Sequence, residues 1–254
     1  MVGPPTWISF TDRLVTELRA RRQAKSWENY HDTLATQSVD VVYGYVDNVY
    51  MASRATDEPP RERLIQTALE LLAEEGLEGL SLRSIARRAG VSHGAPLRHF
   101  ASLADLLSEV AAHGFRVLSE AIEKSAAQLA PGVGPLARLR AGSRAYVECA
   151  VANPALFALM FRPELLHADN ASYRRDGGAA FEQVVTQVRA AQDAGWHPQR
   201  DTRVLAGAVW ASLHGLAILW AQGALSGPVP RASLEDALTT ALELLMDGAP
   251  GDKR

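Results

Sequence analysis

Apolar side chains recur every three or four residues along most of the chain after residue 60, with polar residues between them. The clearest stripe lies between Pro60 and Glu75, and its spacing places its members on one face of an α-helix. Pro60 suits the first turn of such a helix, and Gly76 is a typical stop signal. The members of the stripe are Leu64, Ile65, Ala68, Leu69, Leu71 and Leu72.

Capping residues and breakers divide the rest of this region into further helices. We expect Ser81 to cap a short helix, LRSIARRA, which Gly90 ends, and Ser92 to cap a second short helix, HGAPLRHF. Ser102 opens a long helix that extends to about Leu129. No strand pattern follows residue 60, so the predicted fold class is all-α. The remaining helices are predicted over residues 134–151, 154–162, 172–195, 201–223 and 233–247.

The two short helices are joined by the turn AGVS and lie between two longer helices, which is the layout of a helix-turn-helix unit. Ile85 and Ala86 give the first short helix an apolar face. Gly90 suits a turn backbone that a β-carbon would strain. We expect Val91 to fill the space between the short helices and Phe100 to anchor the second one in the core.

Charge changes the picture for this unit. The chain of 254 residues has a formal net charge of −3, so any attraction to nucleic acid must come from a local patch. The stretch from Gly79 to Phe100 contains no acidic residue, and such a positive face is what phosphate binding requires. A solvated helix surface that happens to lack acids is the alternative. The basic residues of the stretch are Arg83, Arg87, Arg88, His93, Arg98 and His99.

The stretch RERLIQTALELLAEEGLEGLSLRSIARRAGVSHGAPLRHFASLADLL resembles the DNA-binding domain of the tetracycline-repressor (TetR) family of bacterial transcriptional regulators. The resemblance implies a homodimer whose recognition helices enter successive major grooves of a palindromic operator. It further implies a ligand-responsive repressor that a small-molecule effector releases from DNA. The resemblance rests on the spacing of Ala68, Gly76, Ile85, Ala86, Ala89, Gly90, Val91, Ser92, Gly94, His99, Phe100 and Leu106.

Roles in DNA binding follow from this resemblance. Ser81 falls where the family's hydroxyl residue caps the first short helix and touches phosphate. The segment from Ser92 to Pro96 falls on the groove-facing part of the recognition helix, Gly94 lets the backbone approach DNA closely, and His99 lies near the phosphates. The residues expected to contact DNA are Ser81, Arg83, Ser92, His93, Gly94, Ala95, Pro96, Leu97, Arg98 and His99.

Two positions depart from the family pattern. Leu97 stands where the family commonly has tyrosine, and Leu103 where it has lysine, and both family residues usually contact the DNA backbone. Phosphate contacts fix position rather than read sequence. Losing two contacts of about 1 kcal/mol each would weaken binding roughly 30-fold, which Arg83 and Arg98 could offset in part. A TetR-fold protein that binds a ligand or partner but has weakened or lost DNA binding is therefore the alternative function.

The second half resembles a TetR C-terminal subfamily marked by the stretches YVECAVANPALFALMF and WASLHGLAIL. Trp210 and His214 form its Trp-x3-His-Gly element and share a helix face. His214 could hydrogen-bond an effector or sense its charge; the alternative is a buried histidine satisfied by a backbone carbonyl. The candidate pocket residues, which are plain core in the alternative interpretation, are Phe115, Leu118, Tyr146, Phe157, Met160, Phe161, Phe181, Trp210 and His214.

Helices 201–223 and 233–247 are expected to form the homodimer, as a four-helix interface about a two-fold axis. The first offers small residues that permit close approach: Ala206, Gly207, Ala208, Ala211 and Gly215. The second offers Leu234, Ala237, Leu238, Ala241, Leu242 and Leu245.

Residues 58–107 are expected to form the DNA-binding domain, residues 108–248 the ligand-binding and dimerisation domain, and residues 249–254 a disordered tail. Residues 1–57 are expected to be a poorly ordered extension or a mis-assigned start, with translation beginning at Met51. A real extension that adds contacts through Arg19, Arg21, Arg22 and Lys25 is the alternative.

The remaining chemistry is sparse. No hydrolase, metalloprotease or nucleotide-binding fingerprint occurs, so we expect no enzyme activity, no cofactor and no metal. The single Cys149 lies in an apolar run and is expected to be a small buried hydrophobe. No secretory signal pattern and no uninterrupted apolar run long enough for a membrane are found, so a cytoplasmic protein that binds no membrane is expected.

Overall fold

The computed structural model describes residues 59–247, and its regular elements in that range are all helical. The all-α prediction is confirmed for these residues. The predictions for residues 1–57 and for the tail 249–254 lie outside the described residues. The α-helices are α4 (Pro60–Glu75), α5 (Leu82–Arg88), α6 (Leu103–Ala127), α7 (Pro135–Ala152), α8 (Pro154–Met160), α9 (Ala171–Asp193), α10 (Thr202–Ala221) and α11 (Leu234–Met246).

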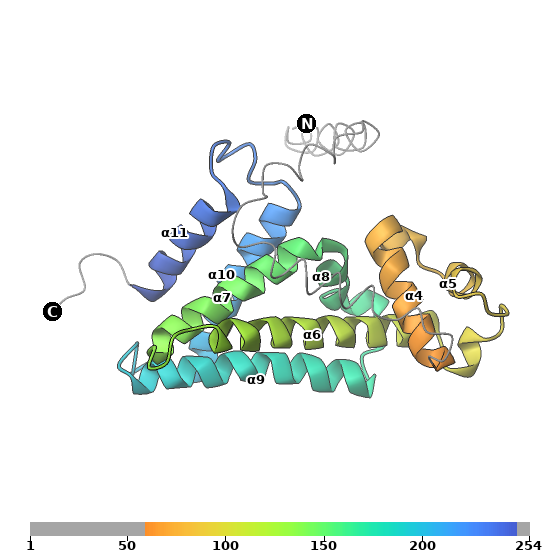
Figure 1. The fold of residues 1–254 in the computed structure, drawn as a ribbon, viewed down its shortest axis with the longest axis horizontal. Coiled ribbons are helices and arrows are strands. Elements are labelled where there is room, and N and C mark those ends of the chain that lie inside the picture. The colour runs from red at the N-terminus through yellow and green to blue at the C-terminus, as the bar shows by residue number, and fades with distance from the viewer. Residues whose placement is uncertain (1–58, 248–254) are drawn as a thin grey trace, which may run out of the picture. The chain divides into compact units, whose positions relative to one another are not determined.

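Helix α6 is the element that the other helices share. It packs against α4, α7, α8 and α9, and Figure 1 shows α4 and α5 at its N-terminal end with α9 running alongside it. Leu106, Val110 and Ala111 of α6 are fully buried in the core. The predicted domain boundary at residues 107 and 108 therefore falls inside one continuous helix.

Two predicted caps and one predicted stop of the DNA-binding unit are confirmed. The Ser81 hydroxyl accepts a hydrogen bond from the Ser84 amide at 3.0 Å and caps α5. The Ser102 hydroxyl accepts one from the Asp105 amide at 3.1 Å and caps α6. Gly90 has a φ of 67°, the left-handed region in which glycine is favoured.

The core residues of this unit are also confirmed. Ile85 and Ala86 are fully buried, Phe100 is buried at the far end of the unit, and Val91 packs against the core. The Arg61 guanidinium lies over the Phe100 ring, 5.2 Å from its centroid. The apolar face of α5 and the Phe100 anchor thus hold the unit against α4.

The prediction of a second short α-helix over HGAPLRHF is wrong. Its regular structure is limited to a single 3-10 turn, η2 (Pro96–Arg98), with Ala95 at its N-cap. Ser92 does not act as a cap through its side chain; its carbonyl accepts the Ala95 amide at 2.9 Å. Pro96 has no N–H to bond that carbonyl four residues back, and Gly94 further lowers the local helix propensity, so a regular α-helical turn does not form.

The expectation that no segment is apolar enough for a membrane needs a correction at helix α10. Ser212 and His214 interrupt its apolar run, but among the described residues α10 is nevertheless long and apolar enough to cross a membrane by length and composition. In the structure α10 packs against α7, α9 and α11. Most of its length is not buried by these contacts, which leaves an apolar face.

Replacing Gly90 with alanine should destabilise the protein by about 1 kcal/mol, because a β-carbon is disfavoured at a φ of 67°. No heavy atom lies within 4 Å of the position that this β-carbon would take, so the cost comes from the backbone alone. Gly94→Ala is the matched control, since its site is equally open and its φ is not positive. Urea unfolding measures both free energies; equal losses would contradict the assignment.

Candidate DNA-contact surface and ligand pocket

Helix α5 carries the first group of basic residues on the surface. Arg83 and Arg87 are exposed on it, and the structure gives neither an ion pair within residues 59–247. Arg88 is different, because its guanidinium pairs with Glu74 and lies 3.9 Å from Glu75. The pair with Glu74 lowers the pKa of that carboxyl. Arg88 is therefore directed toward α4, whereas Arg83 and Arg87 remain available for phosphate.

Residues 92–99, which we call the recognition segment, follow the turn after α5. Arg98 on this segment is exposed, and Leu97 is 57% exposed. Two expected DNA contacts are less accessible, because Ala95 is half-buried and Pro96 is buried. The remaining expected residues of the segment are all exposed: Ser92, His93, Gly94 and His99.

The two departures from the family pattern lie in different environments. Leu97 is an exposed apolar side chain on the recognition segment and is not among the side chains that pack against the core. Leu103 begins α6 and packs, half-buried, against the hydrophobic core. Leu103 therefore has a packing role. Leu97 is the one of the two residues that departs from the family pattern at an exposed position.

A cavity of about 270 Å³ lies among α6, α7, α9 and α10. Of the nine predicted pocket residues, Phe157, Met160 and His214 do not line it; Phe157 and Met160 are buried in the hydrophobic core. The predicted residues that do line it are Phe115, Leu118, Tyr146, Phe161, Phe181 and Trp210. The lining residues that the sequence interpretation missed are Ile122, Tyr173, Arg174, Gly177, Gly178, Ala180 and Val184.

One polar cluster includes two residues of this wall, Tyr146 and Trp210. The Tyr146 hydroxyl accepts a hydrogen bond from the Trp210 indole N–H at 2.8 Å and shares another with Nδ1 of His214 at 3.0 Å. The His214 ring also lies against Phe161, with ring centroids 4.6 Å apart. Burial lowers the pKa of His214 and raises that of Tyr146. The histidine is therefore satisfied by a tyrosine hydroxyl, where the sequence alternative had a backbone carbonyl.

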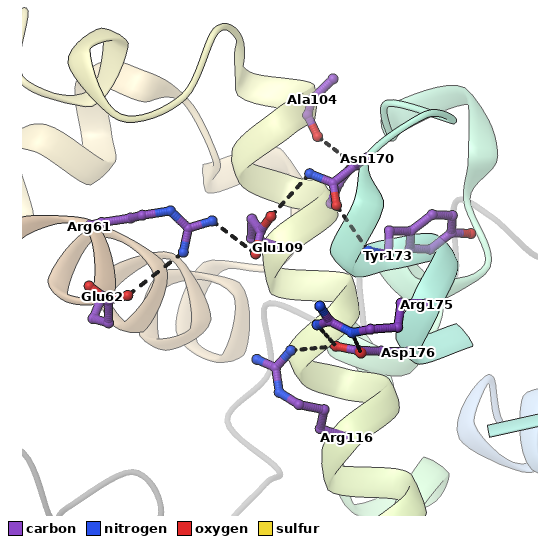
Figure 2. Close-up of polar contacts among 10 residues, drawn as sticks. Arg61, Glu62, Ala104, Glu109, Arg116, Asn170, Tyr173, Arg175 and Asp176 are labelled. Carbon is purple, nitrogen blue, oxygen red and sulfur yellow. Dashed lines mark hydrogen bonds and ion pairs between the residues drawn. The ribbon is translucent and has the colours of Figure 1, made fainter. Parts of the chain in front are cut away.

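A second polar cluster joins α4, α6 and α9, as Figure 2 shows. The Glu109 carboxylate on α6 accepts from Arg61 of α4 at 3.0 Å and from the Asn170 side-chain amide at 3.1 Å. Burial alone would raise the pKa of Glu109, but the hydrogen bonds from Asn170 and Arg61 outweigh it and lower the pKa. Asn170 also caps α9, since its side-chain oxygen accepts the Tyr173 amide at 2.9 Å.

The connector between α8 and α9 makes a second set of polar contacts with the first turns of α6. His167 pairs through Nδ1 with the Asp105 carboxylate, and this hydrogen bond lowers the pKa of Asp105. The His167 backbone amide donates to the hydroxyl of Ser108, which is fully buried, at 2.9 Å. The helix that follows the recognition segment is thus fixed by the start of α9 and by the connector before it.

A third contact joins α6 and α9 further along (Figure 2). Asp176 accepts from Arg116 of α6 at 2.6 Å and from the neighbouring Arg175 at 2.7 Å. Burial would raise the pKa of this carboxyl, but the two arginines lower it. Asp176 lies beside Gly177, which lines the cavity, so cavity wall and polar contact share one turn of α9.

Cys149 is buried, and burial raises the pKa of its thiol to about 12, so it acts as a small apolar residue as expected. Within residues 59–247, no three side chains of the types that ligate metals gather into a cluster.

The polar residues between the helices had little signal in the sequence. Glu109 and Asn170 are common surface residue types and lie 61 positions apart. The one available hint was Gly177-Gly178 within a predicted helix, since two adjacent glycines in a helix interior are unfavourable and call for a packing or functional reason.

Two families match the chain in sequence. Residues 64–110 match the family described as "Bacterial regulatory proteins, tetR family". Residues 139–245 match the family described as "Tetracyclin repressor-like, C-terminal domain". No curated protein matches the chain.

Solved structures share the fold over most of the described range. A protein of unknown function from Rhodococcus sp. RHA1 is 32% identical, with a TM-score of 0.65 over 76% of this chain and 96% of its own. The TetR family transcriptional regulator PfmR from Thermus thermophilus is 22% identical, with a TM-score of 0.55 over 74% of this chain and 98% of its own. The fatty acid degradation regulator FadR from Bacillus halodurans is 15% identical, with a TM-score of 0.58 over 76% of this chain and 97% of its own.

His113 on α6 makes the stability of the protein depend on pH. Burial, together with the charge of Arg116, lowers its pKa from 6.5 to about 4, so the folded protein binds this proton less well than the unfolded chain. The stability that the neutral ring contributes is complete above pH 6.5 and is lost as the pH falls toward 4.

Urea unfolding at about pH 7.5 and about pH 5 tests this. The fall in unfolding free energy between the two pH values should be about 2 kcal/mol smaller in His113→Gln than in the original protein. Comparing the pH-dependent differences cancels any packing change that the substitution causes. An identical fall in both proteins would show that His113 titrates normally.

Proposed function

The chain belongs to the TetR family of DNA-binding transcriptional regulators, and from this premise we propose that it is a ligand-responsive repressor. It binds a palindromic operator as a homodimer, and a small-molecule effector in the C-terminal helices releases it from DNA. The family is not one of enzymes. We further propose that it acts in the cytoplasm and belongs to the subfamily with a Trp-x3-His-Gly element, here Trp210 and His214.

The observation that carries the DNA-binding role is the exposed positive charge on a helix-turn-helix unit that has no acid between residues 79 and 100. Arg83, Arg87 and Arg98 supply most of this charge. Neutralising phosphates releases counterions from DNA and provides sequence-independent affinity. Base reading is then left to the exposed residues Ser92, His93 and Gly94 of the recognition segment.

The polar clusters at the start of α9 support a route for effector-dependent release. A ligand in the cavity touches the first two turns of α9, where Tyr173 and Gly177 form part of the wall. The same helix end begins at Asn170, which holds Glu109 and, through it, Arg61 of α4. A shift of this end of α9 therefore changes the contacts that hold α4 in place.

The position of α4 affects DNA binding through packing. Helix α4 contacts both α5 and α6, so its position sets that of the recognition segment. In a symmetric dimer the two segments must match successive major grooves, so a small change in each protomer disturbs both half-sites at once. A ligand that favours the displaced position lowers affinity for DNA by the difference between its affinities for the two positions.

The apolar face that α10 and α11 leave uncovered supports the dimer. Val204 is 72% exposed and Leu219 44% exposed on α10, and Leu244 is 70% exposed on α11. Open space surrounds Gly207 and Gly215, so a second helix could approach closely there. We propose that a second copy of this chain covers this face, with residues 58–107 acting as the DNA-binding part and 108–248 as the ligand and dimer part.

A ligand-binding protein that has lost tight DNA binding is the second candidate. The observation that favours it is Leu97, an exposed apolar residue where the family commonly has a phosphate-contacting tyrosine. The burial of Pro96 removes one further expected contact. Direct measurement of DNA binding separates the two functions.

Selection of duplex DNA from a random library with the purified protein should enrich a two-fold symmetric site. Fluorescence anisotropy on that site should then show tighter binding by Leu97→Tyr, about 5-fold, because the hydroxyl restores one phosphate hydrogen bond. Arg98→Ala should weaken binding and reduce the salt slope by about 1. Sequence preference should not change in either variant.

Val229→Tyr is the control, since Val229 is 43% exposed in the connector between α10 and α11, and it should leave affinity unchanged. If no sequence is enriched and no DNA is retained even at low salt, the ligand-binding protein without DNA binding is the better account.

Light scattering after size exclusion tests the dimer. The purified protein at micromolar concentration should have twice the chain mass of 27.5 kDa. Leu244→Glu should shift it toward a monomer, because the substitution places a charge in the proposed apolar interface. Val229→Glu should not. A monomeric mass for the unsubstituted protein would remove the dimer.

A further inference from the structure

We propose that the effector is an apolar monocarboxylate whose apolar body fills the cavity and whose carboxylate meets Arg174 at the mouth. The identification of this ligand as an effector rests on the proposed function. The chemical class of the ligand is inferred only from the residues that line the cavity or contact its wall.

The polar groups of the wall are already engaged. The Trp210 indole N–H donates to the Tyr146 hydroxyl, and that hydroxyl is also bonded to His214. The Tyr173 hydroxyl donates to the Met160 carbonyl at 3.2 Å. A ligand whose inner part carries hydroxyl or amide groups would have to bury them without these partners, which costs free energy. The inner part of the ligand is therefore apolar.

The part of the cavity wall on α9 also favours a ligand with an apolar inner part. Gly177 and Gly178 are adjacent in the interior of a helix, where glycine is a poor helix former. A β-carbon at Gly177 would lie 3.2 Å from the Phe115 ring, and one at Gly178 would meet nothing within 4 Å. The absence of side chains at these two positions leaves room beside the aromatic wall and opens it toward the surface.

Arg174 is the one charged residue among those that line the cavity, and its side chain is 69% exposed. It lies one turn before Gly178 on α9, beside the opening. Its acidic neighbour Asp169 is 3.6 Å away and 86% exposed, which makes this ion pair weak. A ligand carboxylate can replace Asp169, because a guanidinium binds carboxylates through two parallel hydrogen bonds.

The same charges limit the ligand to one negative charge. Asp169 partly neutralises the single arginine and would repel a dianion at the mouth. A cation is the other possibility, because the aromatic rings of Phe115, Phe161 and Trp210 could attract one. No lining residue is acidic, however, and Arg174 would repel a cation at the opening.

Isothermal titration calorimetry on the full chain, with octanoate, 1-octanol and octylammonium as matched probes, tests the class. The cavity of about 270 Å³ has room for about nine groups of water size, so an eight-carbon chain suits it. Octanoate should bind about 3- to 10-fold more tightly than octanol, and octylammonium should bind more weakly than either.

Variants at the mouth should move octanoate binding in opposite directions. Arg174→Gln should weaken it about 3- to 10-fold and leave octanol unchanged, while Asp169→Asn should tighten it about 2-fold by freeing the guanidinium. Arg189→Gln is the matched control, because Arg189 is exposed on the same helix but does not line the cavity. Octanoate that fails to bind, binds no better than octanol, or is insensitive to Arg174→Gln would overturn the proposal.

The test does not depend on DNA. Octanoate that binds through Arg174 supports this class of ligand even if no operator is found, in which case the repressor proposal fails alone. An operator that is bound while octanoate is not would leave the repressor and overturn the carboxylate.

Discussion

The half-buried carboxylate of Glu109 is the constraint on which the arrangement of the described helices depends. Its side chain is only 12% exposed, and burying an unpaired carboxylate is costly. Its partners come from different parts of the fold: Arg61 begins α4, and Asn170 begins α9. The charge is satisfied only while both helices keep their present positions relative to α6. Helix positions at the candidate DNA-contact surface and at the cavity are therefore tied to each other through α6.

Helix α6 runs without a break from the polar contacts with α4 and α9 to the cavity wall. Its first turns carry Asp105, Ser108 and Glu109, and the turns beyond carry Phe115 and Leu118 of the cavity wall. A helix transmits a displacement along its length because its backbone hydrogen bonds keep it rigid over this distance. The proposed division into a DNA-binding part and a ligand part does not require a flexible linker, because both parts share the continuous helix α6.

The helices could be predicted because their signals are local. Ser81, Ser102 and Gly90 act on neighbouring backbone groups, so the sequence shows them directly. The helical prediction for HGAPLRHF is wrong because Pro96 lacks the N–H that a helical turn needs, although helix signals surround it. The cavity was predicted in part, since large aromatic residues at helical spacing point inward. Whether such a residue lines the cavity, as Phe161 does, or packs behind it depends on tertiary packing that periodicity does not carry.

The contacts among α4, α6 and α9 could not be predicted, because Glu109 and Asn170 have no pattern that marks them as partners. Hydrogen–deuterium exchange of Glu109→Gln against the original protein tests their role most directly, with Glu123→Gln, exposed on the same helix, as control. Loss of the charge should speed amide exchange at the starts of α4 and α9 and leave α10 unchanged. Unchanged exchange at both starts, or an equal increase in every helix, would contradict the account.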